Sequence, residues 1–441
     1  MMRTTTSLTL LAVAALLSGC GILKKSTKST PTVGDRVPVL VTEIDIEADP
    51  EVAALPMILP AATVNADWAQ SGGNAPKLLE HVALATSVGQ AWAVSIGQGS
   101  TRSRRLGGGP VIAGGKVFTI DTAGTVRAFD ATSGAAVWAV SFGDTKGNEA
   151  LLYGGGLAVD NSRVYATNGY GNVAALDVAT GGIAWTVRPG GPLRGAPTVA
   201  DGSVYVISQD NQLFSLKAAD GSTNWSSAAA LEIAGVFGNG SPAVDRGTIV
   251  AGFSSGELNA YRYENGRQVW QDALSRTSIS TGVAALSDID ASPVIANGAV
   301  YAVGQGGRMV ALDLNTGQRV WELNIAGIAT PWVAGDWLFA VNDKAQVIAV
   351  QRLTGKIRWI NQLPRWQNEK KKSGPINYVG PVLAGDRLIV AGSNGALINI
   401  RPTDGATQSE TTVREGVRFQ PAVAGQMMYL VTDAGRLLAY R

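Results

Sequence analysis

One pattern recurs along most of the chain and limits what it can fold into. The stretch VYAVGQGGRMVALDLNTGQRVW runs from Val300 to Trp321, and similar stretches end at Trp138 and Trp225. Each contains an apolar strand, two turn sequences rich in Gly, Asn and Asp, and a terminal Trp, in the same order. Self-similarity at a fixed period is the signature of a repeat protein, so we interpret the chain as one array of similar units.

Each full unit encodes four short strands. It opens with a Pro or a substitute and an apolar run that ends in a tight turn, as in PTVADGSVY from Pro197 and PVIANGAVY from Pro293. Asp-Gly and Asn-Gly between alternating apolar residues are strong hairpin signals, because both turn positions require positive φ. Two further turns follow, such as QDNQL and AADG. Three turns between four strands predict a four-stranded antiparallel meander.

Eight such units can be counted. Their first strands start at Pro110, Leu157, Pro197, Pro242, Pro293, Pro331, Pro381 and Pro421. The span from Pro110 to Pro421 is 311 residues in seven intervals, or about 44 residues each, which is the usual period of propeller blades. The sequence therefore predicts an all-β fold, an eight-bladed β-propeller with four-stranded antiparallel blades.

The two ends of the array are out of phase, which predicts how the ring closes. The terminal Trp positions are 92, 138, 185, 225, 270, 321 and 359, and the eighth, near Ala406, has lost its Trp. Trp92 precedes the first unit, while the last unit, from Pro421, stops after three strands. We expect the N-terminal strand Gly89–Gly97 to supply the missing fourth strand, so that no blade interface stays unpaired.

The recurring Trp residues have two possible roles. Stacked radially, each sheet buries its faces on its neighbours, and a Trp on the outer strand would pack between blades. The alternative is a set of rings that stack on a ligand. The fixed period favours structural packing.

Charge and composition exclude several classes of function. Lys and Arg number 36 and Asp and Glu 34, so the net charge is +2 and no nucleic-acid partner is indicated. The single His, His81, precedes the repeats, which excludes a multi-His metal site or a Ser-His-Asp triad within them. The acidic residues Asp130, Asp177 and Asp313 stand where a strand enters a turn, so turn hydrogen bonds explain them.

The N-terminus predicts export and a lipid anchor. Arg3 is followed by an apolar run from Leu8 to Leu17, too short to span a bilayer but typical of a signal peptide. Leu-Ser-Gly-Cys, ending at Cys20, resembles the lipobox of bacterial lipoproteins, which implies cleavage before Cys20 and its acylation. The alternative is an ordinary secretory signal with an incidental Cys. Gly21, in place of the Asp that commonly retains lipoproteins in the inner membrane, favours the outer membrane by the same resemblance.

These features give a predicted domain organisation. Residues 1–19 form the signal peptide, residues 20–80 the lipidated Cys and a tether, and residues 81–441 the propeller. The polar, Pro-containing stretch after Cys20 is typical of a flexible tether. Whether the apolar stretch EVAALPMILPAA, residues 51–62, docks on the propeller stays open.

The repeats resemble those of quinoprotein-type propellers, and two segments between blades resemble the BamB family of lipoproteins of the outer-membrane β-barrel assembly machinery. The segments are PGGPLRGAP, residues 189–197, and LSDIDASP, residues 286–293. The resemblance implies that they contact a POTRA domain of the barrel-forming subunit. It assigns partner binding to Leu193, Arg194, Asp288 and Asp290. Where the family has a further Leu, this chain has Gly191, which implies a smaller apolar contact.

Topology places these two segments together without the resemblance. Both join the outer strand of one blade to the inner strand of the next, and all such connections emerge on one face of a propeller. We expect an exposed Leu193 beside Arg194, with Asp288 and Asp290 nearby, as in a small mixed interface. The alternatives are that Arg194 pairs with a local carboxylate and that either Asp caps a turn.

The resemblance implies a function. The chain is expected to be a non-enzymatic lipoprotein without a cofactor, on the periplasmic face of the outer membrane of a Gram-negative bacterium. Its expected partners are the barrel-forming subunit, unfolded barrel precursors and the membrane that holds its anchor. The alternative is a periplasmic quinone-dependent (PQQ) dehydrogenase or an inactive relative.

Two basic stretches remain without a role. TRSRRLGGGP, residues 101–110, holds three Arg, and RWQNEKKKSGPINYVGP, residues 365–381, is a long insertion between blades with three consecutive Lys. Solvated loops are the favoured interpretation of both. A contact with lipid headgroups or with a partner stays open.

Overall fold

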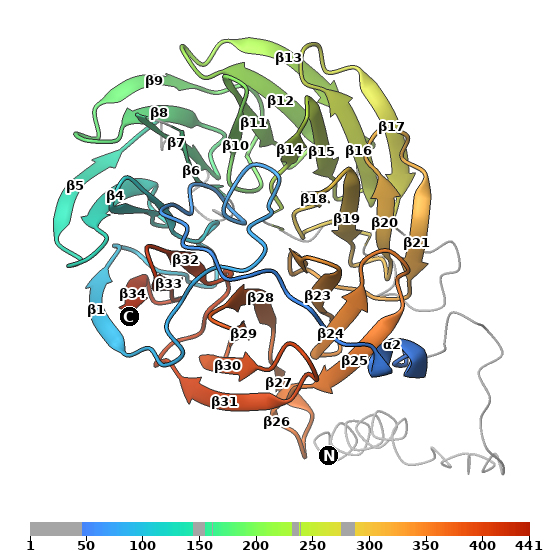
Figure 1. Ribbon diagram of the computed structural model, residues 1–441. Coiled ribbons are helices and arrows are strands. Elements are labelled where there is room, and N and C mark those ends of the chain that lie inside the picture. The colour runs from blue at the N-terminus through green and yellow to red at the C-terminus, as the bar shows by residue number, and fades with distance from the viewer. Residues whose placement is uncertain (1–45, 144–154, 161, 232–237, 239, 275–286) are drawn as a thin grey trace, which may run out of the picture. The chain divides into compact units, whose positions relative to one another are not determined.

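The described part of the chain forms a ring of eight sheets. The computed structural model describes residues 46–143, 155–160, 162–231, 238, 240–274 and 287–441. These residues belong to one compact unit. Within these ranges eight four-stranded antiparallel sheets stand around a central axis (Figure 1), which confirms the predicted eight-bladed propeller. The predicted signal peptide, Cys20 and the tether as far as residue 45 lie outside the described residues.

The first four blades follow one another in chain order. Blade 1 consists of β2 (Val111–Ala113), β3 (Lys116–Ile120), β4 (Thr125–Asp130) and β5 (Ala136–Ser141). Blade 2 consists of β6 (Gly155–Asp160), β7 (Arg163–Asn168), β8 (Val173–Asp177) and β9 (Ile183–Val187). Blade 3 consists of β10 (Thr198–Ala200), β11 (Ser203–Ile207), β12 (Gln212–Lys217) and β13 (Thr223–Ala228). Blade 4 consists of β14 (Ala243–Asp245), β15 (Thr248–Gly252), β16 (Glu257–Arg262) and β17 (Gln268–Ala273).

The remaining blades complete the ring. Blade 5 consists of β18 (Val294–Ala296), β19 (Ala299–Val303), β20 (Met309–Asp313) and β21 (Arg319–Leu323). Blade 6 consists of β22 (Trp332–Ala334), β23 (Trp337–Val341), β24 (Gln346–Gln351) and β25 (Ile357–Gln362). Blade 7 consists of β28 (Tyr378–Ala384), β29 (Arg387–Gly392), β30 (Ala396–Ile400) and β31 (Thr407–Thr412), and a two-stranded hairpin, β26 (Trp366–Asn368) and β27 (Ser373–Pro375), precedes it. Blade 8 consists of β32 (Ala422–Ala424), β33 (Met427–Val431), β34 (Arg436–Tyr440) and β1 (Gln90–Ser95).

Blade 8 is assembled from both ends of the described chain, as predicted. Strand β1 pairs antiparallel with β34, with Gln90 opposite Tyr440 and Ser95 opposite Arg436. Just beyond the ladder, the backbones of Gly89 and Arg441 exchange two hydrogen bonds of 2.9 Å. The ring is therefore closed by backbone pairing between segments almost 350 residues apart in the sequence.

The recurring Trp residues pack between blades. Six of them donate from Nε1 to a carbonyl of the following blade, over 2.7–3.1 Å. Each ring also lies over a turn glycine of that blade, and Trp321 shows why the glycine is needed. Gly355 has a φ of +73°, and a Cβ there would come within 2.8 Å of the Trp321 ring. These contacts confirm the packing role. The donors and acceptors are Trp138 and Val178, Trp185 and Ala218, Trp225 and Tyr263, Trp270 and Leu314, Trp321 and Arg352, and Trp359 and Pro402.

The absent eighth Trp follows from the way the ring closes. The register of β30 and β31 places Ser409 where the other outer strands carry Trp. A Trp there would need a glycine in the turn between the third and fourth strands of blade 8. That turn does not exist, because β1, the fourth strand, comes from the other end of the array. The docking Trp and its glycine are therefore missing together.

An N-terminal strap, residues 46–88, crosses the centre of the ring on one face (Figure 1). It begins with the short helix α2 (Pro50–Ala54), capped by Asp49 and held on blade 6 by a 2.7 Å hydrogen bond from the Asp49 N–H to the Ile357 carbonyl. From Asn65 to Val82 it contacts the first strand of every blade. The hydrogen-bonded pairs, in the order of blades 1 to 8 and with the strap residue first, are Trp68 and Ile112, Ala69 and Val159, Gln70 and Val199, Ala75 and Val244, Pro76 and Ile295, Glu80 and Trp332, Val82 and Leu383, and Asn65 and Val423.

Part of the predicted tether is therefore packed structure. Residues 46–80 lie on the ring. The apolar stretch of residues 51–62, for which docking was left open, is therefore docked on the propeller. His81 is structural here, since its Nδ1 lies 2.8 Å from the Pro60 carbonyl and its Nε2 accepts from the Asp386 N–H. The strap lies beside the turns that join first and second strands. We call the opposite face, with the connections between blades, the connection face.

Candidate partner-binding site

The two segments singled out in the sequence lie on the connection face. Residues 188–197 lead from β9 in blade 2 to β10 in blade 3, and residues 287–293 lead from blade 4 into β18 of blade 5. The first segment pairs with the turn after β11, where the Arg194 N–H donates to the Ile207 carbonyl over 2.9 Å. The connection between them, from blade 3 to blade 4, lies outside the described residues at 232–237 and 239.

Arg194, Asp288 and Asp290 form one buried ion cluster. Arg194 Nη2 lies 3.0 Å from Asp290 Oδ1 and 3.9 Å from Asp288 Oδ1, and all three side chains are almost completely buried. Gln305, from the turn after β19, donates a hydrogen bond to the second oxygen of Asp290. The segments thus meet as the topology predicted, and the pairing of Arg194 with a carboxylate, left open in the sequence, is present.

The expectation of an exposed Leu193 was wrong. Leu193 is 0% exposed and belongs to the buried apolar cluster formed by blades 2 and 3. The cause is a β-bridge between Leu193 and Ser208, which turns the side chain inward. Pro192 is the exposed neighbour. The partner-binding role of Leu193, Arg194, Asp288 and Asp290 stays a prediction, and any such role is indirect because all four are buried.

Burial dominates the electrostatics of the cluster. It raises the pKa of Asp290 from 3.8 to about 6, and the neighbouring Asp288 carboxylate adds to the rise. Arg194 and Gln305 act in the opposite direction but do not compensate the loss of water. Two carboxylates therefore lie beside one guanidinium in a buried position.

The Asp290→Asn variant should reveal this burial as a pH dependence of stability. The pKa of Asp290 is higher in the folded than in the unfolded chain, so its contribution to stability is full below about pH 4 and is lost as pH rises through about 6. A difference of two pKa units corresponds to on the order of 3 kcal/mol. Urea unfolding should show the native chain losing about that much relative to the variant between pH 4 and pH 7. Parallel pH curves would contradict the assignment.

Two residues of the cluster carried no recognisable sequence pattern. A Cβ at Gly238 would lie 1.4 Å from Asp290 Oδ1, so the cluster requires glycine there. Gln305 lies in a turn whose sequence is typical of an ordinary connection between two strands. Both residues act through contacts between separate segments of the chain, which the repeat pattern does not encode.

A cavity of about 330 Å³ opens on the connection face next to the cluster. It lies between the connections of blades 5, 6 and 7, and Gln305 belongs both to its lining and to the cluster. Ile328, 45% exposed, stands at the cavity with Ile376 and Tyr378. The cluster therefore adjoins a recess with apolar and polar lining, Asn342 and Asp343 among the latter, of the kind that accepts side chains or small molecules.

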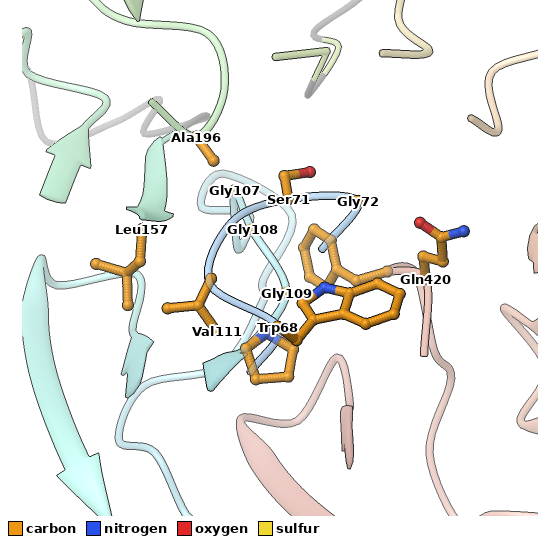
Figure 2. Close-up of a pocket in the computed structure, with 12 residues that line it drawn as sticks. Trp68, Ser71, Gly72, Gly107, Gly108, Gly109, Val111, Leu157, Ala196 and Gln420 are labelled. Atoms are coloured by element: carbon orange, nitrogen blue, oxygen red, sulfur yellow. The ribbon is translucent and has the colours of Figure 1, made fainter. Parts of the chain in front are cut away.

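A small cavity lies between the strap and the chain segments that begin blades 1 to 3. Figure 2 shows Trp68, Ser71 and Gly72 of the strap beside Gly107, Gly108 and Gly109. The cavity between them is about 60 Å³, well below the roughly 300 Å³ at which small-molecule sites begin. An organic quinone cofactor does not fit in this cavity.

The repeat carboxylates serve turns, as expected. Asp130, Asp177 and Asp313 each accept hydrogen bonds from the backbone N–H and the hydroxyl of the residue three positions later. These bonds lower the pKa of all three groups. Across the described ranges, no group of three or more His, Cys, Asp or Glu side chains is arranged to hold a metal ion. Helices long and apolar enough to cross a membrane are likewise absent from them.

Comparisons with known proteins agree with the geometry. The family model described as outer membrane protein assembly factor BamB matches residues 122–361 and 364–441. A protein of that name from Shigella dysenteriae is 30% identical over 391 residues, covering 78% of this chain and 86% of its own length. The match with a relative from Moranella endobia spans 60% of that protein.

Solved structures share the fold. The crystal structure of BamB from Moraxella catarrhalis covers 80% of this chain and 100% of its own, with a TM-score of 0.67 and 19% identity. A europium-containing methanol dehydrogenase reaches the same TM-score with 13% identity over 83% of this chain and 89% of its own. Both likenesses show the propeller fold alone, whereas the family model covers most of the repeats. The chain belongs to the family of outer membrane protein assembly factor BamB.

Proposed function

We propose that this protein is an assembly factor for outer-membrane β-barrel proteins, anchored through acylated Cys20 to the periplasmic face of the outer membrane. It binds a POTRA domain of the barrel-forming subunit and assists folding and insertion of unfolded barrel precursors. It does so as a scaffold and not as an enzyme. Membership of the family supports this proposal.

The ion cluster on the connection face is the observation that carries the proposal. Arg194 joins the connection between blades 2 and 3 to that between blades 4 and 5, over a distance of two blades. A buried ion pair adds little to stability compared with apolar packing of similar volume, but removing one partner is costly. Its value here is that it fixes the relative position of connections from different blades.

The cluster prepares a surface and does not itself form the contact. Among the described residues, exposed atoms of the connection face include those of Pro192, the rim of the cavity beside Gln305 and Ile328. A recess with an exposed apolar residue and polar groups such as Gln305 and Asn342 suits a partner segment that offers an apolar side chain and hydrogen-bonding groups. A preorganised surface of this kind loses little freedom when it binds.

The Arg194→Ala variant should bind the POTRA domain at least tenfold more weakly than the native chain. Removing Arg194 takes away the guanidinium that lies 3.0 Å from the buried Asp290 carboxylate, so the connections must rearrange. Affinity for the purified POTRA domains is measured by calorimetry, and folding is checked by thermal melting. Arg401→Ala is the matched control, because Arg401 forms an exposed pair with Asp404 in a turn of the strap face. Native affinity in folded Arg194→Ala would refute the site.

Gly191→Leu tests the same surface by gain of function. The Cβ position of Gly191 is open, with its nearest neighbour, Asp210 Oδ1, 3.9 Å away. A Leu there would add apolar surface beside Pro192 and restore the residue that the family carries. We expect tighter binding to the POTRA domains, by several-fold, with unchanged stability. Unchanged or weaker binding would place the contact elsewhere.

The quinone-dependent alternative has its own test. Absorbance of the purified protein and a calcium assay measure a bound quinone and its metal directly. A stoichiometric quinone with Ca²⁺ would overturn the proposal and favour the dehydrogenase.

A further inference from the structure

The basic insertion between blades 6 and 7 folds as a separate hairpin on the rim. Strands β26 and β27 pair Trp366 with Pro375 and Asn368 with Ser373. Figure 1 shows the hairpin projecting past the rim between β25 and β31. At its base the Ile376 N–H donates to the Arg365 carbonyl, which joins the two ends of the hairpin, and the hydroxyl of Tyr378 in β28 donates to the Pro364 carbonyl.

The tip of the hairpin concentrates uncompensated positive charge. Lys370, Lys371 and Lys372 are consecutive and exposed, and none of them forms an ion pair with a described residue. The single acid of the hairpin, Glu369, accepts instead from the backbone N–H groups of Arg365 and Trp366, over 2.8 and 3.1 Å. With Arg365 the hairpin carries four cations against one carboxylate.

The hairpin also presents an aromatic side chain and has a fixed shape. Trp366 is half-buried, and the Arg365 guanidinium lies over its ring at 5.8 Å from the centroid. Asn368 Oδ1 accepts from the Lys371 N–H over 3.0 Å, which orders the turn that carries the lysines. Positive charges beside an indole ring on a rigid projection fit a surface with negative charge outside and apolar chains beneath.

We propose that the β26–β27 hairpin binds the anionic headgroups of membrane phospholipids. This inference rests on the proposed membrane anchoring and adds a second, electrostatic contact to it. The packed strap begins on blade 6, at the hydrogen bond from Asp49 to Ile357, and the outer strand of the same blade leads into the hairpin. Residues 21–45 between Cys20 and the strap span at most about 85 Å when extended, so the anchor allows this sector to reach the bilayer.

Vesicle flotation tests the proposal with the full chain carrying Cys20→Ser, so that acylation contributes nothing. We expect binding to vesicles of phosphatidylethanolamine with phosphatidylglycerol, little binding to phosphatidylcholine alone, and release by salt. Lys370→Gln, Lys371→Gln and Lys372→Gln combined should weaken binding about 100-fold, since each Lys contributes about fivefold near an anionic surface.

The chain offers a control of equal charge. Arg102→Gln, Arg104→Gln and Arg105→Gln combined also remove three cations, in the segment between β1 and β2. We expect this variant to bind vesicles like the Cys20→Ser chain. Equal losses in both triple variants, or no difference between the two kinds of vesicle, would overturn the inference.

A protein partner is the competing occupant. If the lysine variant binds vesicles normally but loses another protein of the assembly machinery in co-purification, the hairpin is a protein contact and the proposal is wrong. Neither result bears on Arg194, because POTRA affinity is measured separately and without lipid. Failure of the hairpin proposal therefore leaves the proposed function standing.

Discussion

A chain trimmed through Val94 should lose more than about 5 kcal/mol of unfolding free energy, comparable to the whole stability of many domains. The deletion removes most of β1, so β34 is left with an open edge and blade 8 has three strands. It also removes the strap, with its contacts to the first strands of all eight blades. Calorimetry should show a melting temperature lower by about 10 °C or more, or no cooperative transition.

Two shorter deletions separate the contributions. A chain trimmed through residue 45 keeps the whole packed unit and should melt like the full chain. A chain trimmed through Val88 loses the strap but keeps β1, and should fall between the two. If the chain trimmed through Val94 melted like that trimmed through residue 45, closure by β1 would not stabilise the ring.

Trp321→Ala should destabilise the protein by about 3–5 kcal/mol. Trp321 is 8% exposed, packs on Tyr301 at 6.1 Å between ring centroids and donates to the Arg352 carbonyl over 2.8 Å. The substitution leaves a large cavity between blades 5 and 6 and a carbonyl without its donor. Urea unfolding measures the change.

The neighbouring residue supplies the control. Val320 precedes Trp321 on β21 and is 57% exposed, so Val320→Ala should change stability by less than about 0.5 kcal/mol. Gly355→Ala approaches the same contact from the other blade, because a Cβ there meets the Trp321 ring. It should destabilise by at least 1 kcal/mol. A loss below about 1 kcal/mol in Trp321→Ala would mean that the Trp contacts do not hold the blades together.

The fold was predictable because its information is local and repeated. Turn dipeptides, alternating strands and a periodic Trp recur often enough that the boundaries of the blades could be counted, and the phase of Trp92 against Pro421 predicted the closure. Burial within a blade follows the same local pattern: every residue of β11 is buried, whereas every residue of β31 is exposed.

The candidate site was predictable only in part. Its topology placed Arg194 and the two aspartates on one face, but their depth depends on the β-bridge between Leu193 and Ser208 and on Gly238, neither of which a repeat pattern records. The strap is the other feature that the sequence pattern did not predict. Its sequence has no period, and its partners are mostly single backbone groups spread over eight blades, with the Trp332 side chain in blade 6.

The pairing of β1 with β34 has a consequence for biosynthesis. Trp92 is paired with Ala439, so β1 cannot pair until a strand 347 residues further along the chain has been synthesised. While the chain is being synthesised, seven blades can form in succession, but the eighth exists only once the carboxyl-terminal strands have been made. Such distant contacts make folding slow and leave an unpaired edge exposed in the meantime. A protein that we propose to assist the folding of other β-proteins therefore itself exposes an unpaired strand edge until its own folding is complete.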